Sequence, residues 1–130
     1  MTELRFASDV LARIRATERR YDERAFLFVL ASIEYLQSQL QVRRHVAGTE
    51  VAEACRQFAL EHYGLMAQTV LAHWGVTRTE DFGRIVFTLV EAGILVRQPN
   101  DAEEDFAGVY RFDEAFEAGY VWQGVRGGGG

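Results

Sequence analysis

Few residues in this 130-residue chain have the type and spacing that chemistry requires. Two short segments, residues 61–64 and 72–75, each end in histidine, an aromatic residue and glycine. A zinc site would need further ligands at close spacing, and neither Cys55 nor His45 supplies them. Histidine in the last turn of a helix, followed by glycine, is typical of helix termination. We therefore expect no metal and no cofactor.

The sequence also lacks the common catalytic patterns. It contains no phosphate-binding loop, no His-Glu-x-x-His motif, no paired-carboxylate helix motif and no recognisable Ser/His/Asp order. Cys55 lies on an apolar helix face and is expected to be a buried hydrophobic residue, not a nucleophile. We therefore predict that the protein is not an enzyme.

The lone cysteine and the N-terminus bear on the compartment. One cysteine cannot form an internal disulfide, which fits a reducing cytoplasm. The first residues lack the pattern of a signal peptide, and no apolar run reaches the roughly 18 residues of a membrane helix. A cytoplasmic protein without membrane contact is expected.

Charge is unevenly distributed along the chain. Residues 1–97 hold 12 arginines and 12 acidic residues, whereas residues 98–130 hold 2 arginines and 7 acidic residues. All 14 basic residues other than histidine are arginines. Two arginine groups could hold nucleic acid (RNA or DNA) or an acidic partner, or simply balance the acidic C-terminal region. These groups are Arg13, Arg15, Arg19 and Arg20, and, in a later loop, Arg43 and Arg44.

The hydrophobic pattern predicts a mainly helical fold with a small β-hairpin. Five helices are expected at residues 8–20, 22–41, 49–63, 65–74 and 79–92, the second being buried almost all round. Residues 94–96 and 108–112 are predicted as two strands joined by an acidic loop, with a short helix after them. The last three helices and this wing resemble a winged helix-turn-helix core with two additional N-terminal helices. We expect one domain over residues 1–119 and a flexible glycine-rich tail over 120–130.

The fifth helix would be the recognition helix of such a fold. Thr77 and Glu80 have the spacing of a capping box. The predicted outer face carries Glu80, Arg84, Phe87, Thr88 and Glu91. A groove-reading helix needs arginine, lysine, asparagine or glutamine there, and the acidic loop 101–105 would repel phosphate. This face suits a protein contact better, with Phe87 as a possible anchor, unless Phe87 packs beneath another part of the chain.

Three functions therefore stay open. The leading one is a non-enzymatic interaction or regulatory domain that binds a protein partner or forms a homo-oligomer, using Phe87, Glu80, Arg84 and Glu91. The alternative is nucleic-acid binding through the two arginine groups. The third follows from the end of the chain, Arg126 and Gly127–Gly130, which is similar to the Arg-Gly-Gly end of ubiquitin-like modifiers; a flexible tail explains it equally well.

Several sequence blocks resemble a small family of bacterial proteins known mainly from planctomycete and verrucomicrobial lineages. They span about residues 20–117 in order. The blocks are RY at 20–21, AFLFVL at 25–30, RHVAG at 44–48, AHWGV at 72–76, TEDFG at 79–83, IVF at 85–87, LVEAG at 89–93 and DEAF at 113–116. The resemblance implies membership of that family and brings no activity, cofactor or binding residue with it.

Overall fold

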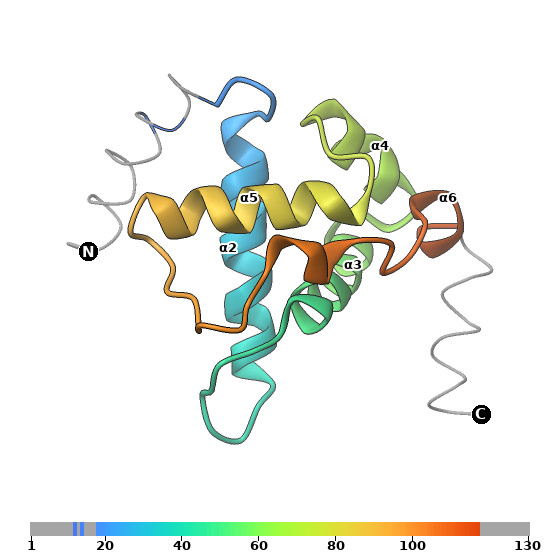
Figure 1. Ribbon diagram of the computed structural model, residues 1–130. Helices are drawn as coiled ribbons and strands as arrows, with labels where there is room; N and C mark the ends of the chain where they lie inside the picture. The colour runs from blue at the N-terminus through green and yellow to red at the C-terminus, as the bar shows by residue number, and fades with distance from the viewer. Residues whose placement is uncertain (1–11, 13, 15–17, 118–130) are drawn as a thin grey trace.

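The computed structural model describes Ala12, Ile14 and residues 18–117, and this part of the chain is mainly helical (Figure 1). Its helices are α2 (Glu23–Ser38), α3 (Gly48–Tyr63), α4 (Ala67–His73), α5 (Thr79–Glu91) and α6 (Phe112–Ala115), with 3-10 turns η1 (Gly64–Met66) and η2 (Glu103–Phe106). Ala12 and Ile14 are helical, within the first predicted helix. The rest of that helix before residue 18, and the predicted tail 120–130, lie outside the described residues.

Helix α2 occupies the centre of the fold, and α5 crosses over it (Figure 1). The Asp22 carboxylate begins α2 by accepting a hydrogen bond from the Arg24 amide at 2.8 Å. Phe28 of α2 is buried, and its ring contacts three other aromatic rings. These are Phe58 in α3, Trp74 after α4 and Phe82 in α5, with centroids 5.6, 5.8 and 6.4 Å away. The Phe28 side chain thus contacts residues from the segments of α3, α4 and α5. Leu27 of α2 is exposed, so α2 is not buried on every side.

A buried carboxylate fixes the start of α5. Asp81 accepts hydrogen bonds from the Thr77 amide at 2.9 Å, from the Arg78 amide at 3.2 Å and from the Tyr21 hydroxyl at 2.6 Å. Because the N-cap is Arg78, the third helical position is residue 81, and the predicted Thr77–Glu80 capping box is wrong. Burial and the neighbouring Asp81 carboxylate raise the pKa of Tyr21 above its usual value. The contact also fastens the chain before α2 to α5.

The predicted β-hairpin and the winged-helix fold are wrong: residues 18–117 contain no strand. The amides of Ile94 and Leu95 donate to the Leu89 carbonyl, at 3.0 and 3.3 Å, and so complete the C-terminus of α5. At the other end of α5, the Val109 amide donates to Thr79 Oγ1 at 3.2 Å. Thirteen helical residues separate these ends by about 20 Å. The two segments therefore cannot pair, and their donors are already used.

The chain instead returns along α5 in an irregular segment, residues 97–111, called here the return segment (Figure 1). Its Phe106 is buried between α3 and α5. A Cβ atom at Gly48 of α3 would lie 2.9 Å from the Phe106 ring, and one at Gly83 of α5 would lie 2.9 Å from the Phe106 Cβ. Both positions need glycine because the return segment approaches the two helices so closely.

This close approach predicts the sign of one substitution. At an ordinary mid-helix site, changing glycine to alanine stabilises a protein by about 1 kcal/mol. We expect Gly83→Ala to destabilise this protein by about 1–3 kcal/mol, because the new methyl group overlaps Phe106. Urea unfolding followed by circular dichroism measures the difference, and Thr88→Ala, on the outer side of the same helix, serves as the control. A stabilised Gly83→Ala protein would contradict the described packing.

None of the helices in the described part of the chain combines the length and the apolar character needed to span a membrane.

Candidate functional site

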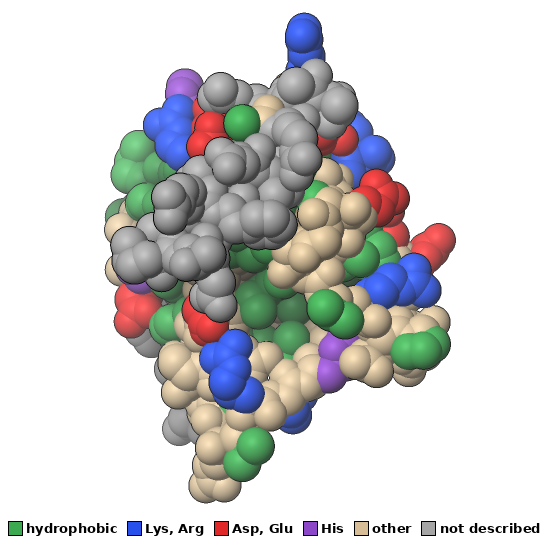
Figure 2. All heavy atoms as spheres, turned by 90° about the vertical axis from the view of Figure 1, so that its left-hand side faces the viewer, with side chains coloured by type: hydrophobic (Ala, Val, Ile, Leu, Met, Phe, Trp, Pro, Cys, Tyr) green, Lys and Arg blue, Asp and Glu red, His purple; other side chains and the backbone are tan. Residues whose placement is uncertain are grey.

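The candidate site is a pocket of about 270 Å³ between α2, the C-terminal half of α5, the 39–47 loop and the return segment. Figure 2 looks onto this face of the molecule and shows a hollow whose interior is hydrophobic. The apolar side chains that line the pocket are Ile33, Val46, Val51, Val86, Phe87, Val90, Leu95, Val96 and Phe106. Charged side chains stand around its rim, from Arg43, Arg44, His45, Arg97, Asp101 and Asp105.

The 39–47 loop forms one wall and is fixed by three side-chain contacts. The Gln37 amide bonds both the carbonyl and the amide of Arg44, at 2.6 and 3.2 Å. The Arg44 guanidinium pairs with Glu50 at 2.8 Å, and Glu50 also accepts from the Ala47 amide at 2.8 Å. The wall is therefore preorganised, which lowers the entropy lost when a ligand binds.

The opposite wall comes from the return segment, whose acidic residues stabilise local turns. The Asp101 carboxylate accepts from the Gln98 amide at 2.8 Å, and the Asp105 carboxylate accepts from the Ala102 amide at 3.1 Å. The acidic loop 101–105, which was predicted to join two strands, thus stabilises the backbone conformation around η2.

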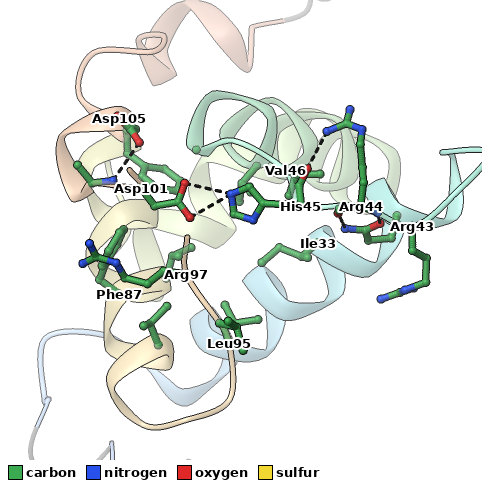
Figure 3. Close-up of a pocket in the computed structure, with 18 residues that line it drawn as sticks. Ile33, Arg43, Arg44, His45, Val46, Phe87, Leu95, Arg97, Asp101 and Asp105 are labelled. Atoms are coloured by element: carbon green, nitrogen blue, oxygen red, sulfur yellow. Dashed lines mark hydrogen bonds and ion pairs between the residues drawn. The ribbon is translucent and has the colours of Figure 1, made fainter. Parts of the chain in front are cut away.

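The two walls meet through His45 and Asp101. His45 Nε2 lies 3.1 and 3.0 Å from the two oxygens of the Asp101 carboxylate, and Figure 3 shows the two side chains facing each other. Burial alone would raise the pKa of Asp101, but the bonds from the Gln98 amide and His45, together with the Arg97 charge, lower it below its usual value. Asp101 is thus held as an anion and joins the 39–47 loop to the return segment.

Phe87 and Arg97 form the edge of the pocket (Figure 3). The Arg97 guanidinium carbon lies 5.7 Å from the centroid of the Phe87 ring, a cation–π arrangement. Phe87 is half-buried, so it serves both as pocket lining and as a platform for Arg97.

The other predicted contact residues of α5 lie away from the pocket. Glu80 lies at the far end of the helix and accepts a hydrogen bond from the Gly108 amide at 3.2 Å. Glu80 and the exposed Arg84 line a separate mixed-charge groove together with Arg20 and Arg78. Glu91 is exposed. The structure therefore brings only Phe87 of this set to the pocket, and no finding tests whether the others contact a partner.

Within the described residues, the two arginine groups proposed for nucleic-acid binding do not converge. Arg13 and Arg15 lie outside the described residues. Arg19 and Arg20 precede α2, and Arg43 and Arg44 follow it, so its 16 residues separate the groups by about 24 Å. Arg43 pairs with Glu34 at 3.1 Å and Arg44 with Glu50, so carboxylates of the protein itself neutralise the second group.

The other two histidines, His62 and His73, and the cysteine, Cys55, lie outside the pocket lining. His62 lies in the last turn of α3, with its ring 4.1 Å from that of Phe58, and His73 lies in the last turn of α4. Within the described residues, no three His, Cys, Asp or Glu side chains gather in a way that could hold a metal ion. Cys55 is fully buried, as predicted, and burial raises the pKa of its thiol to about 12.

Comparisons of this chain with protein families, curated proteins and solved structures find no match. The family resemblance inferred from the sequence blocks therefore stays a prediction.

Sequence reasoning singled out Phe87, Arg43 and Arg44 but missed the rest of the pocket. Arg97 had a usable signal, since it follows three apolar residues directly after a helix end and is thus placed at an apolar edge. His45 and Asp101 are 56 residues apart, and no local pattern connects them.

The Arg44–Glu50 pair predicts how stability depends on pH. The hydrogen bond from Arg44, then that from the Ala47 amide, lowers the pKa of Glu50 from 4.5 to about 2. A lowered pKa means that the ionised form is stabilised by folding, so this contribution is present above about pH 4.5 and is lost as the pH falls towards 2. Because the Glu50 side chain is 37% exposed, we expect Glu50→Gln to destabilise the protein at pH 6 by no more than about 1 kcal/mol.

Urea unfolding at several pH values checks this expectation. The difference between the wild type and Glu50→Gln should shrink between pH 4.5 and 2, whereas a difference independent of pH would contradict the ion-pair account. Glu61→Gln, an exposed change on the same helix, is the control.

Proposed function

We propose that the protein is a non-enzymatic interaction domain that binds a protein partner through the pocket and its surroundings. The observation that carries this proposal is the apolar pocket itself, open at the surface and built from preorganised walls. Its volume of about 270 Å³ falls below the roughly 300–1,000 Å³ of small-molecule sites. That size suits a side-chain anchor from another protein, the usual centre of an interface hot spot.

Exposed apolar residues around the pocket support a protein contact further. Val96, on the rim, is 84% exposed. Val42 lies outside the pocket lining, in the 39–47 loop whose later residues form the other wall, and is 76% exposed. Apolar side chains this open beside an apolar hollow are typical of a surface that a partner covers. The partner is either a different protein or a second copy of this chain. The single buried cysteine supports the cytoplasm as the place of this interaction.

Site-specific photo-crosslinking in the native cells tests the proposal. We expect a photoreactive residue in place of Val96 to form discrete adducts with one protein, because Val96 stands at the pocket rim. The matched control replaces Met66, an exposed apolar residue of η1 outside the pocket lining. Mass spectrometry of the adducts identifies the partner and distinguishes a second copy from another protein.

A pocket-filling variant completes the test. Val46→Trp places a large ring into the hollow and should abolish the adducts formed from position 96, while circular dichroism verifies that it folds. Identical adducts from positions 96 and 66, or adducts that persist with Val46→Trp, would refute the proposed function.

A further inference from the structure

One cation on the pocket rim, Arg97, forms no ion pair within the part of the chain that the structure describes. Its charge acts on Asp101 from beyond ion-pair distance and helps to lower the pKa of that carboxyl. Arg97 Nη2 donates a long hydrogen bond to the Pro99 carbonyl, at 3.4 Å. The guanidinium is exposed and is held beside the Phe87 ring, so most of its five N–H donors remain available at the mouth of an apolar pocket.

The remaining rim charges are already engaged. Arg43 and Arg44 pair with Glu34 and Glu50. The Asp101 and Asp105 carboxylates accept bonds from backbone amides, and Asp101 also faces His45. As far as the described residues go, the pocket thus offers a ligand an apolar interior and one available cation, Arg97, at its edge.

We propose, on the basis of the protein-binding function above, that the pocket selects an acidic peptide segment of its partner. An apolar side chain enters between α2 and α5, and a carboxylate next to it in the segment binds the Arg97 guanidinium. Phe87 supports both contacts, because it lines the pocket and carries Arg97 on its ring.

The geometry favours a carboxylate over a phosphate. A single planar guanidinium matches a carboxylate through two parallel hydrogen bonds. A phosphate carries more negative charge and would approach Asp101 and Asp105 on the same rim, so repulsion would oppose it. A glutamate or aspartate beside an apolar anchor is therefore the expected motif.

Matched peptides test the motif directly. The probes are acetylated and amidated nine-residue peptides with a central Leu, Phe or Trp flanked by Glu, and the same peptides with Gln or phosphoserine in place of Glu. Fluorescence anisotropy measures Kd for the intact protein. We expect the best Glu peptide to bind about fivefold more tightly than its Gln counterpart, the range of an exposed ion pair, with a smaller ratio in high salt.

Two charge-matched variants locate the effect. Arg97→Gln should bring the ratio between Glu and Gln peptides close to one. Arg78→Gln removes the same charge from the N-cap of α5, at the opposite end of the helix from Arg97, and should leave the ratio unchanged. Val46→Trp should abolish binding of both peptide sets.

The outcomes separate this inference from the function on which it rests. Equal binding of Glu and Gln peptides, both blocked by Val46→Trp, overturns the acidic motif and leaves the protein-binding pocket standing. Tighter binding of the phosphoserine peptides, or no binding of any peptide, also overturns the acidic motif. The proposed function itself is tested by the crosslinking experiment, and it fails if the adducts from position 96 survive Val46→Trp or are identical to those from position 66.

Discussion

The structure depends most on the burial of Phe106 between α3 and α5. The ring fits because Gly48 and Gly83 present bare backbone to it from the two helices. This packing draws the return segment across the molecule, covers the joint between α3 and α5 and supplies part of the pocket lining. A side chain at either glycine would push the segment outward, so the fold and the pocket share one steric requirement.

Helix positions follow well from the sequence, because apolar periodicity and terminal glycines are local signals. The predicted helices at 49–63 and 79–92 match α3 and α5 to within a residue at each end. The prediction of a β-hairpin was wrong because it left out contacts between segments that are distant in the sequence. Ile94 and Val96 have side chains that favour strands. The amides of Ile94 and Leu95 nevertheless bond the Leu89 carbonyl in the last turn of α5, and the chain then turns back so that Phe106 packs between α3 and α5. The strand propensity of a segment indicates a conformation that it can adopt, whereas its tertiary contacts determine the conformation that it adopts in the fold.

The pocket was less predictable because its walls come from separate parts of the chain. Each wall has an ordinary local interpretation: a buried helix, a loop with basic residues, an acidic turn. Only folding brings His45 opposite Asp101 and puts Phe87 under Arg97. Local pairing also changes the meaning of the charge pattern, since Arg43 and Arg44, which looked like a basic surface in sequence, are matched by Glu34 and Glu50.

The fully buried Cys55 gives this protein an internal kinetic reporter. Its thiol lies in the core beside Ser32 of α2, and its high pKa keeps it un-ionised at neutral pH. Alkylating reagents attack the thiolate, so modification must wait until α3 separates from α2. Because the chain has no second cysteine, the rate of alkylation reads out that opening motion without any added label.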